Sequence, residues 1–245
     1  MLGSFVVTIK LASMLGLLGA TKLSLHYEGI HGSQDRFGHE IEGRIQTDYW
    51  ENQQIFASYQ RLSRSYVSAS SLYDQIFSIG HNFSFQLPLS VLVSGSYSPS
   101  PDFSAQWAGL LEPHLILVDR LDFGLGVQIK KYSQETSILL RPSGEWTFSD
   151  AFSAFARGDL LMKPQNLGAL EAGIRWLPVP KFQIRMGAGV GKTYEGVGLS
   201  DSFKQINAAL KFRVVDYLAL MVLGQIYRGD LRDENRFGGG IECSF

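Results

Sequence analysis

The sequence is poor in cysteine and in long apolar runs, and both absences narrow the class of protein. Its single cysteine, Cys243, excludes an intramolecular disulfide and a multi-cysteine metal site. Beyond residue 20, no apolar run approaches the roughly 18 residues that a membrane-spanning helix needs. The formal net charge of −1 is not the basic excess of a nucleic-acid-binding protein. We therefore expect neither a helical membrane protein nor a nucleic-acid partner.

Motifs for cofactors are missing as well. The five histidines show no metal-ligand spacing, and neither a phosphate-binding loop nor a dinucleotide fingerprint occurs. We expect no cofactor and no metal. Of the 245 residues, 45% are hydrophobic and 18% charged, whereas disorder needs low hydrophobicity and high net charge. No linker or low-complexity segment divides the chain, so one folded domain is predicted.

What the chain has in abundance is strict alternation of apolar and polar residues. In residues 121–132, LDFGLGVQIKKY, the odd positions up to 129 are apolar, and the even positions up to 130 are charged, polar or glycine. Period-two alternation predicts a strand with one apolar face. The pattern recurs along most of the chain, which requires an apolar medium on one side and water on the other. It predicts an all-β, antiparallel, up-and-down transmembrane β-barrel.

The alternating segments number about fourteen, with twelve as an alternative count, and are about 9–12 residues long, which is enough to cross a bilayer when tilted. Short turns alternate with longer polar loops. Pro142 lies within one segment, where a bulge or a locally open pair is expected because proline donates no ladder hydrogen bond. The segments are residues 22–28, 37–49, 52–62, 73–83, 89–97, 106–117, 121–132, 135–146, 152–162, 167–177, 181–192, 203–214, 217–227 and 236–245.

Both ends of the sequence carry export features. Residues 1–20 combine one charge, Lys10, with an apolar run that ends in Gly19 and Ala20, which predicts a cleaved signal peptide and leaves residues 21–245 as the barrel. An inner plug helix or a first strand is the alternative. At the other end, Phe237, Ile241 and Phe245 share one apolar face and end the chain on phenylalanine. This pattern resembles the C-terminal signal for barrel insertion, and an ordinary hydrophobic last strand is the alternative.

The chain from about residue 23 onward resembles the YaiO family of outer-membrane β-barrels. The motifs that carry the resemblance are LSLHYEG followed by a polar loop and DRFG, then YSPSPDFSAQW, and finally YRGDLRDENRFGGGIECSF. The resemblance implies a place in the bacterial outer membrane. Some relatives carry tetratricopeptide repeats and are linked to envelope polysaccharide export, but no helical repeat precedes the barrel pattern here. The partners we expect are outer-membrane lipid and lipopolysaccharide, the barrel-assembly machinery, and a polar solute or polysaccharide.

A soluble barrel of this strand number would leave an apolar interior too wide to pack, while a two-sheet sandwich stays open because alternation does not set closure. With the apolar face outward, charges line the lumen unevenly along the chain. The acidic wall comprises Glu28, Glu40, Glu42, Asp48, Asp74, Glu112 and Asp122. The basic wall comprises Arg157, Arg175, Lys181, Arg185, Lys211, Arg213 and Arg236.

Two interpretations of these walls remain open at this point. Opposed walls would set a transverse field across a pore that favours polar solutes, or salt bridges across the lumen would close it. A non-enzymatic pore or envelope component is the predicted function. The alternative is a lipid-modifying acyl hydrolase or transferase that uses His26, Glu28, His31 and Ser33 at the first loop, because a nucleophile needs a base that a third group orients.

Overall fold

The computed structural model describes residues 20–33, 36–50, 53–66, 69–85, 88–118, 120–196 and 199–245. The predicted signal peptide lies outside these residues except for Ala20. Fourteen strands make up nearly all of the described chain, and within it no helix is long and apolar enough to cross a membrane. The strands are β1 (Thr21–Gly32), β2 (Arg36–Trp50), β3 (Gln53–Tyr66), β4 (Ala69–Ser84), β5 (Leu89–Tyr97), β6 (Trp107–Val118), β7 (Leu121–Lys131), β8 (Thr136–Ser149), β9 (Phe152–Lys163), β10 (Leu167–Val179), β11 (Phe182–Gly196), β12 (Leu199–Val215), β13 (Leu218–Gly229) and β14 (Asp233–Ser244).

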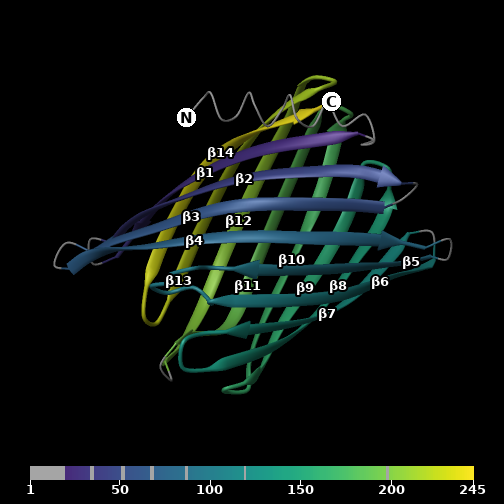
Figure 1. The fold of residues 1–245 in the computed structure, drawn as a ribbon. Coiled ribbons are helices and arrows are strands. Elements are labelled where there is room, and N and C mark those ends of the chain that lie inside the picture. The colour runs from purple at the N-terminus through teal and green to yellow at the C-terminus, as the bar shows by residue number, and fades with distance from the viewer. Residues whose placement is uncertain are drawn as a thin grey trace.

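The strands form one closed barrel in which each pairs antiparallel with its neighbours in the sequence (Figure 1). Closure comes from β1 and β14, which pair from Lys22 opposite Ser244 to Gly32 opposite Glu234. Two backbone hydrogen bonds between Thr21 and Phe245, of 3.1 and 2.8 Å, fix the end of this seam. The predicted count of fourteen is confirmed, and the sandwich alternative is wrong because the sheet has no free edge.

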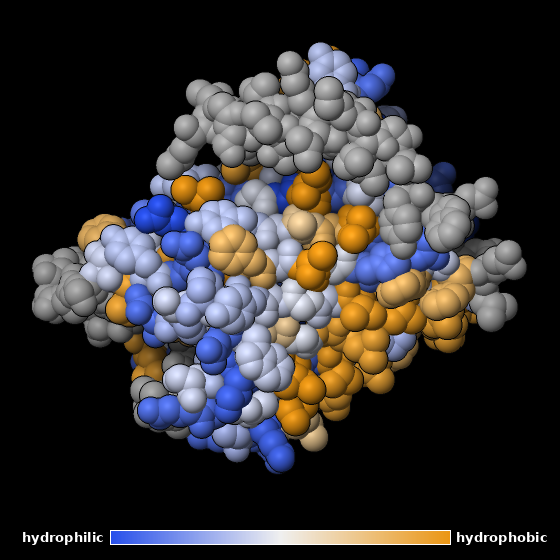
Figure 2. All heavy atoms as spheres, in the orientation of Figure 1, coloured by the Kyte–Doolittle hydropathy of each residue, from blue (hydrophilic) through white to orange (hydrophobic). Residues whose placement is uncertain are grey.

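Burial in the barrel is the reverse of that in a soluble protein. The buried hydrophobic residues of the described chain are Leu161, Ala219 and Tyr227, whereas every strand exposes large hydrophobic side chains. On β7 Leu125 is 45% exposed, and on β14 Phe237 is 66% exposed. Figure 2 shows one side of this surface, with hydrophobic residues gathered at the lower right and hydrophilic ones at the left. An apolar exterior around a closed ring of paired strands is the arrangement of a transmembrane β-barrel.

Several segments predicted as loops are strands. The polar residues 63–66 continue β3, residues 69–71 begin β4, and β11 and β12 run to Gly196 and from Leu199. Backbone pairing of a hairpin continues where both faces are polar, because the ladder depends on the main chain and not on an apolar face. The longest connection between strands is that of β5 and β6, residues 98–106, which lies at the end of the barrel opposite both termini. We call that end the loop end.

Two prolines interrupt the ladder. The β8–β9 register stops at Leu140 opposite Leu160 and resumes at Ser143 opposite Arg157, so the predicted open pair at Pro142 is present. The β6–β7 register has the same break between Leu111 and His114, around Pro113. Proline has no N–H to donate, so each of these sites loses a rung of the barrel.

Candidate functional site: the barrel lumen

The alternation of each strand decides which side chains face the lumen. On β7, Leu125 faces outward, whereas Gln128 faces inward opposite Leu110 of β6 and Leu139 of β8. Glycine positions agree with this assignment: a Cβ added to Gly124 would meet the Ser143 hydroxyl and the His114 ring on the inner face. The inward set is rich in charged, amide and hydroxyl side chains, and it falls into four sectors around the barrel.

The first sector, on β1 and β2, is acidic and contains Glu28, Glu40, Glu42 and Asp48. Neighbouring amides hold two of these carboxylates. Gln60 of β3 donates to Glu40, and the Nε2 atom of Gln54 lies 2.8 Å from Oδ1 of Asp48.

Arg44 and Phe56, of β2 and β3, lie beside the acidic residues. The Arg44 guanidinium lies over the Phe56 ring, 4.0 Å from its centroid. Because it stacks on an aromatic ring, Arg44 places a fixed cation next to the carboxylates. The acidic wall predicted from the sequence does not include this cation.

The second sector, on β3 to β5, carries hydroxyls instead of charge along the middle of the wall, and its charged residues, Arg64 and Asp74, lie near the loop end. Ser58 lies opposite Ser78, and Ser78 lies opposite Ser96. Ser94 faces the same side, opposite Gly80. These strands therefore present small neutral donors and acceptors to the lumen, and they separate the acidic residues of β1 and β2 from those of β6 and β7.

The third sector, on β6 and β7, consists of a histidine between two carboxylates. The Nε2 atom of His114 lies 3.0 Å from Oε1 of Glu112, and its Nδ1 atom lies 3.2 Å from Oδ1 of Asp122. Both ring nitrogens therefore have carboxylate partners, so neither is available to take a proton from a nucleophile. This histidine acts as a counter-ion for the two acids.

The fourth sector, on β8 to β12, carries basic side chains, several of which have acidic partners nearby. Arg175 contacts Glu145 at 2.5 Å, and both bind the Ser153 hydroxyl on the strand between them. Arg141 contacts Asp159 at 2.9 Å.

Arg157, Arg185 and Arg213 are exposed, and among the described residues no carboxylate pairs with them. Arg185 stacks over the Phe155 ring at 4.2 Å. The basic sector is therefore partly neutralised by its own acids and keeps free cations at three positions.

Lys211, Lys181, Arg236 and Asp74 complete the predicted walls. Lys211 contacts Glu242 at 2.8 Å. Lys181 lies in the turn between β10 and β11, directly before the first residue of β11. Arg236 of β14 and Asp74 of β4 lie near the loop end, where Arg236 pairs with Glu234 of its own strand and Asp74 accepts hydrogen bonds from the β5–β6 loop.

The ion pairs run along the wall of the barrel. Arg141–Asp159 joins adjacent strands, while Arg175–Glu145 and Lys211–Glu242 each span one intervening strand. In the part of the chain that the structure describes, no ion pair crosses the lumen. The glycine at 187 helps the side chains to lie flat, since a Cβ there would meet Asn207 and Glu171, which hydrogen-bond over it at 3.1 Å. Because the pairs lie along the wall, these side chains do not extend to the axis of the barrel.

Asp74 fastens the β5–β6 loop to the inner face at the loop end. This carboxylate is fully buried and accepts the backbone N–H groups of Asp102 at 2.5 Å, Phe103 at 3.3 Å and Ser104 at 2.6 Å. Asp102 in turn accepts the N–H of Tyr73 at 2.7 Å. Backbone donors compensate the buried charge, which fixes the loop on β4.

Arg64 holds the same loop from β3, because its guanidinium lies 4.3 Å from the centroid of the Phe103 ring. Asp74 and Arg64 both face inward, so the loop is folded against the inside of the barrel wall. It narrows the loop end over β3 and β4.

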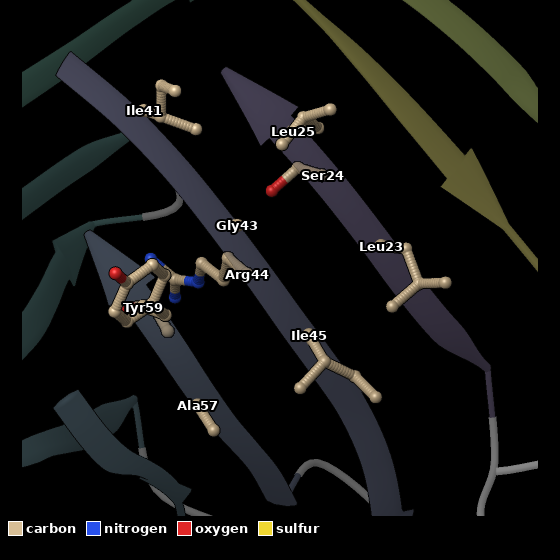
Figure 3. A pocket seen from close by; sticks show the side chains of 10 residues that line it. Leu23, Ser24, Leu25, Ile41, Gly43, Arg44, Ile45, Ala57 and Tyr59 are labelled. Carbon is tan, nitrogen blue, oxygen red and sulfur yellow. The ribbon is translucent and has the colours of Figure 1, made fainter. Parts of the chain in front are cut away.

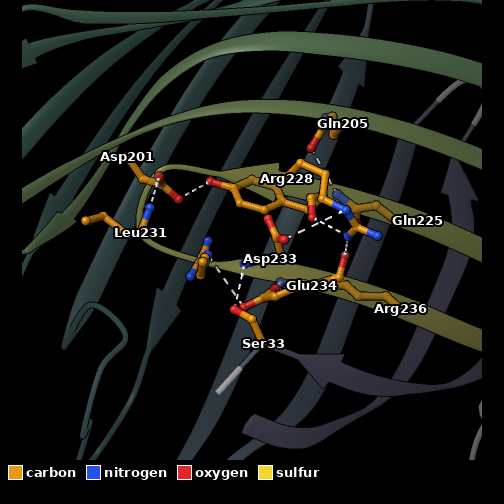
Figure 4. A network of polar contacts seen from close by, with 11 residues as sticks. Ser33, Asp201, Gln205, Gln225, Arg228, Leu231, Asp233, Glu234 and Arg236 are labelled. Atoms are coloured by element: carbon orange, nitrogen blue, oxygen red, sulfur yellow. Dashed lines mark hydrogen bonds and ion pairs between the residues drawn. The ribbon is translucent and has the colours of Figure 1, made fainter. Parts of the chain in front are cut away.

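A second buried aspartate holds the β13–β14 hairpin (Figure 4). Asp201 of β12 accepts the Tyr227 hydroxyl at 2.7 Å and the backbone N–H of Leu231 at 2.9 Å. Next to it, the Ser33 hydroxyl accepts the N–H of Asp233 at 3.1 Å, which joins this hairpin to the β1–β2 connection. Neither set of contacts, that of Asp74 or that of Asp201, can be predicted from the sequence pattern, since each joins segments that are distant in the chain.

Glu234 of β14 lies near the loop end, between an arginine of its own strand and one of the loop that precedes it. Its carboxylate is 3.0 Å from Arg236 and 3.5 Å from Arg232. The carboxylate lies between the two guanidinium groups and neutralises arginines that would otherwise repel one another.

The residues of the hydrolase alternative do not assemble into a catalytic site. His31 packs on the outer face against Phe37, with ring centroids 5.0 Å apart, and the Ser33 hydroxyl is taken by Asp233. His26 and Glu28 face the lumen beside β14. The two histidines therefore lie on opposite faces of β1, and the base–nucleophile contact that such chemistry needs is not formed.

The outer face has a hollow of about 440 Å³ at Gly43. Figure 3 shows that the missing side chain leaves space between Leu23, Leu25, Ile41 and Ile45. The hollow is apolar and belongs to the surface that contacts lipid. On the same outer face of β14, Phe237, Ile241 and Phe245 are all exposed.

The closed ring, the apolar exterior and the charged interior together define a transmembrane β-barrel with a polar lumen. No family model matches the sequence, and no curated protein is similar to it. Three solved outer-membrane proteins share the fold at low sequence identity. Omp33 of Acinetobacter baumannii has a TM-score of 0.59 at 10% identity and covers 94% of this chain and 100% of its own. OprB of Pseudomonas putida has a TM-score of 0.54 at 9% identity, and the match covers 96% of both chains. OprD of Pseudomonas aeruginosa has a TM-score of 0.52 at 9% identity, and the match covers 92% of this chain and 93% of OprD.

Proposed function

We propose that the protein is an integral barrel of the bacterial outer membrane that acts as a pore for small polar solutes, without catalysis. The observation that carries this proposal is the pairing of lumen charges along the wall, which satisfies them without crossing the axis. A lumen lined with polar side chains can admit water and polar solutes, which the apolar interior of the membrane excludes. An envelope polysaccharide is the second kind of cargo that such a lumen would admit.

The remaining expectations from the sequence belong to the same proposal. Membership in the YaiO family, a signal peptide over residues 1–20 and an insertion signal at Phe237, Ile241 and Phe245 would together bring the chain to the outer membrane. There it would contact lipid and lipopolysaccharide after insertion by the barrel-assembly machinery. The exposure of Phe237, Ile241 and Phe245 on the outer face supports their access to a partner during assembly.

Single-channel recording in a planar bilayer tests the pore, and a matched pair of variants makes the result specific. Ser94 faces the lumen and Val93 faces outward on the same strand. We expect discrete conductance steps from the wild type, a smaller unit conductance from Ser94→Trp because the indole occupies lumen volume, and wild-type conductance from Val93→Trp. A silent wild-type barrel would overturn the pore and favour a scaffold or an export-partner role.

The hydrolase alternative makes a different prediction about lipids. Because His31 packs against Phe37 and the Ser33 hydroxyl accepts the N–H of Asp233, His31→Ala and Ser33→Ala should leave the lipid A and phospholipid acylation of the host unchanged. Mass spectrometry of envelope lipids measures this. A change in acylation that depends on either side chain would show that the barrel is an enzyme.

A further inference from the structure

A small cavity lies in the inner wall toward the loop end, apart from the ion pairs described above. Its volume is about 200 Å³, and strands β7 to β12 and the loop after β7 contribute its lining. The pockets that enclose drug-sized ligands are larger, roughly 300–1,000 Å³. The cavity therefore suits a ligand below that size.

Two lysines line the cavity, Lys130 and Lys192. Lys192 lies at an outward position of β11, whereas Lys130 faces inward on β7. Lys130 makes no hydrogen bond or ion pair with any residue that the structure describes. Asp159 also lines the cavity, but Arg141 holds its carboxylate at 2.9 Å. Arg141 repels the Lys130 ammonium more strongly than Asp159 attracts it. A half-buried ammonium with no carboxylate in contact is unfavourable, so an anion entering the cavity would gain an interaction that the protein itself satisfies only in part.

Hydroxyl groups lie beside the cation. Ser137 is 2% exposed and lines the cavity together with Thr193. Neither hydroxyl hydrogen-bonds within the described ranges of the chain. One ammonium and two hydroxyls can donate to a monoanion such as a carboxylate, whereas a phosphate dianion would leave charge uncompensated.

Apart from Tyr132 and Lys192, the rest of the lining is apolar. Leu139 and Leu161 face the cavity, and Leu161 is 7% exposed. Phe203 also lines it, but its ring stacks on Tyr227 with centroids 5.1 Å apart and an interplanar angle of 16°. With one face of the Phe203 ring occupied by Tyr227, the leucines supply the aliphatic surface that suits an alkyl chain.

We propose that this cavity is a binding subsite for a small amphipathic carboxylate, in which Lys130, Ser137 and Thr193 hold the carboxylate and the leucines hold a short alkyl chain. The proposal rests on the pore function, because it names a class of solute that pauses on the way through the lumen. It does not require the pore to be open in order for binding to be measured.

Calorimetric titration of the full barrel, refolded in detergent, tests the subsite with three probes. Sodium hexanoate should bind, whereas acetate lacks the alkyl chain and hexanol lacks the charge, so both should bind at least about tenfold more weakly. Equal binding of hexanol and hexanoate would overturn the proposal, since it would indicate partition into apolar surface or detergent.

Variants localise the site. Lys130→Met should weaken hexanoate binding by about tenfold or more, while Lys131→Met, the next residue and outward-facing, should leave it unchanged. If Lys130→Met fails to refold, Asp159→Asn provides the second test: it removes the carboxylate of the cavity and frees Arg141, so hexanoate should bind more tightly. Unchanged affinity in both inner variants would overturn the subsite.

The conductance measurement separates the two proposals. Hexanoate binding that depends on Lys130 in a barrel without conductance would support the subsite and overturn the pore. Conductance without hexanoate binding would support the pore and overturn the subsite.

Discussion

Leu125→Arg is expected to block assembly of the barrel, whereas Gln128→Arg is expected to leave assembly intact. Leu125 lies on the outer face of β7 and is 45% exposed, while Gln128 faces the lumen. An arginine on the lipid face near the middle of the bilayer costs about 2–4 kcal/mol, and the cost falls toward the interfaces. In the lumen, water and neighbouring polar groups solvate the same side chain.

The two substitutions are matched because they introduce the same residue on one strand, three positions apart. Refolding into lipid vesicles, followed by the heat-dependent mobility of the folded barrel on a gel, measures the folded fraction. Equal loss in both variants would show that β7 tolerates no change, and equal tolerance would mean that the assignment of faces is wrong.

The faces of the barrel were predictable because alternation is a local property. In β7 the odd positions are apolar and the even positions are polar or glycine, and a shift by one residue would place all of them on the wrong side. Closure and strand number followed from repetition of this pattern, combined with the cost of unpaired backbone groups in lipid.

The extent of the strands could not be predicted in the same way. Residues 63–66 have a serine at every second position and no apolar face, so their sequence indicates a loop, yet β3 continues through them to Tyr66. Their pairing with β4 is decided by the hairpin as a whole. The break at Pro113 is hidden for a related reason: Pro113 lies outward between Leu111 and Leu115, so the alternation continues through it and does not reveal the backbone pair that it removes.

The arrangement of lumen charge was the least predictable part. Residues such as Arg175 and Glu145 are 30 positions apart in the chain but meet across one strand, because the register of two hairpins places them side by side. Summing acidic and basic residues over each half of the chain cannot capture such pairs. Such a sum also fails to show that β3 to β5 present serines, and no net charge, along the middle of the wall.

The last expectation concerns ion selectivity, which should depend on the lumen cations that have no acidic partner. Arg157, Arg185 and Arg213 are exposed on the inner face of β9, β11 and β12. Changing all three to glutamine should shift the pore strongly toward cations, because three fewer cations would then oppose the carboxylates of the other sectors. The reversal potential in a gradient of potassium chloride measures the shift.

A control variant removes the same charge from the outside. Arg61, Lys131 and Lys204 lie at alternate, outward positions of β3, β7 and β12, and their change to glutamine should move the reversal potential little. An equal shift in both variants would show that overall surface charge controls selectivity. An unchanged potential in the inner variant would contradict the assignment of free cations to the lumen.

A third result would identify a different role for the same charges. If the wild-type barrel is silent and the inner triple variant conducts, the arginines close the lumen, and their repulsion of cations is then the barrier. That outcome follows from the geometry as directly as selectivity does, since Arg157, Arg185 and Arg213 keep their full charge without carboxylate partners. The fields of such charges are screened over about 10 Å at 0.1 M salt, so a barrier of this origin should weaken as the salt concentration rises, whereas a steric plug should not respond.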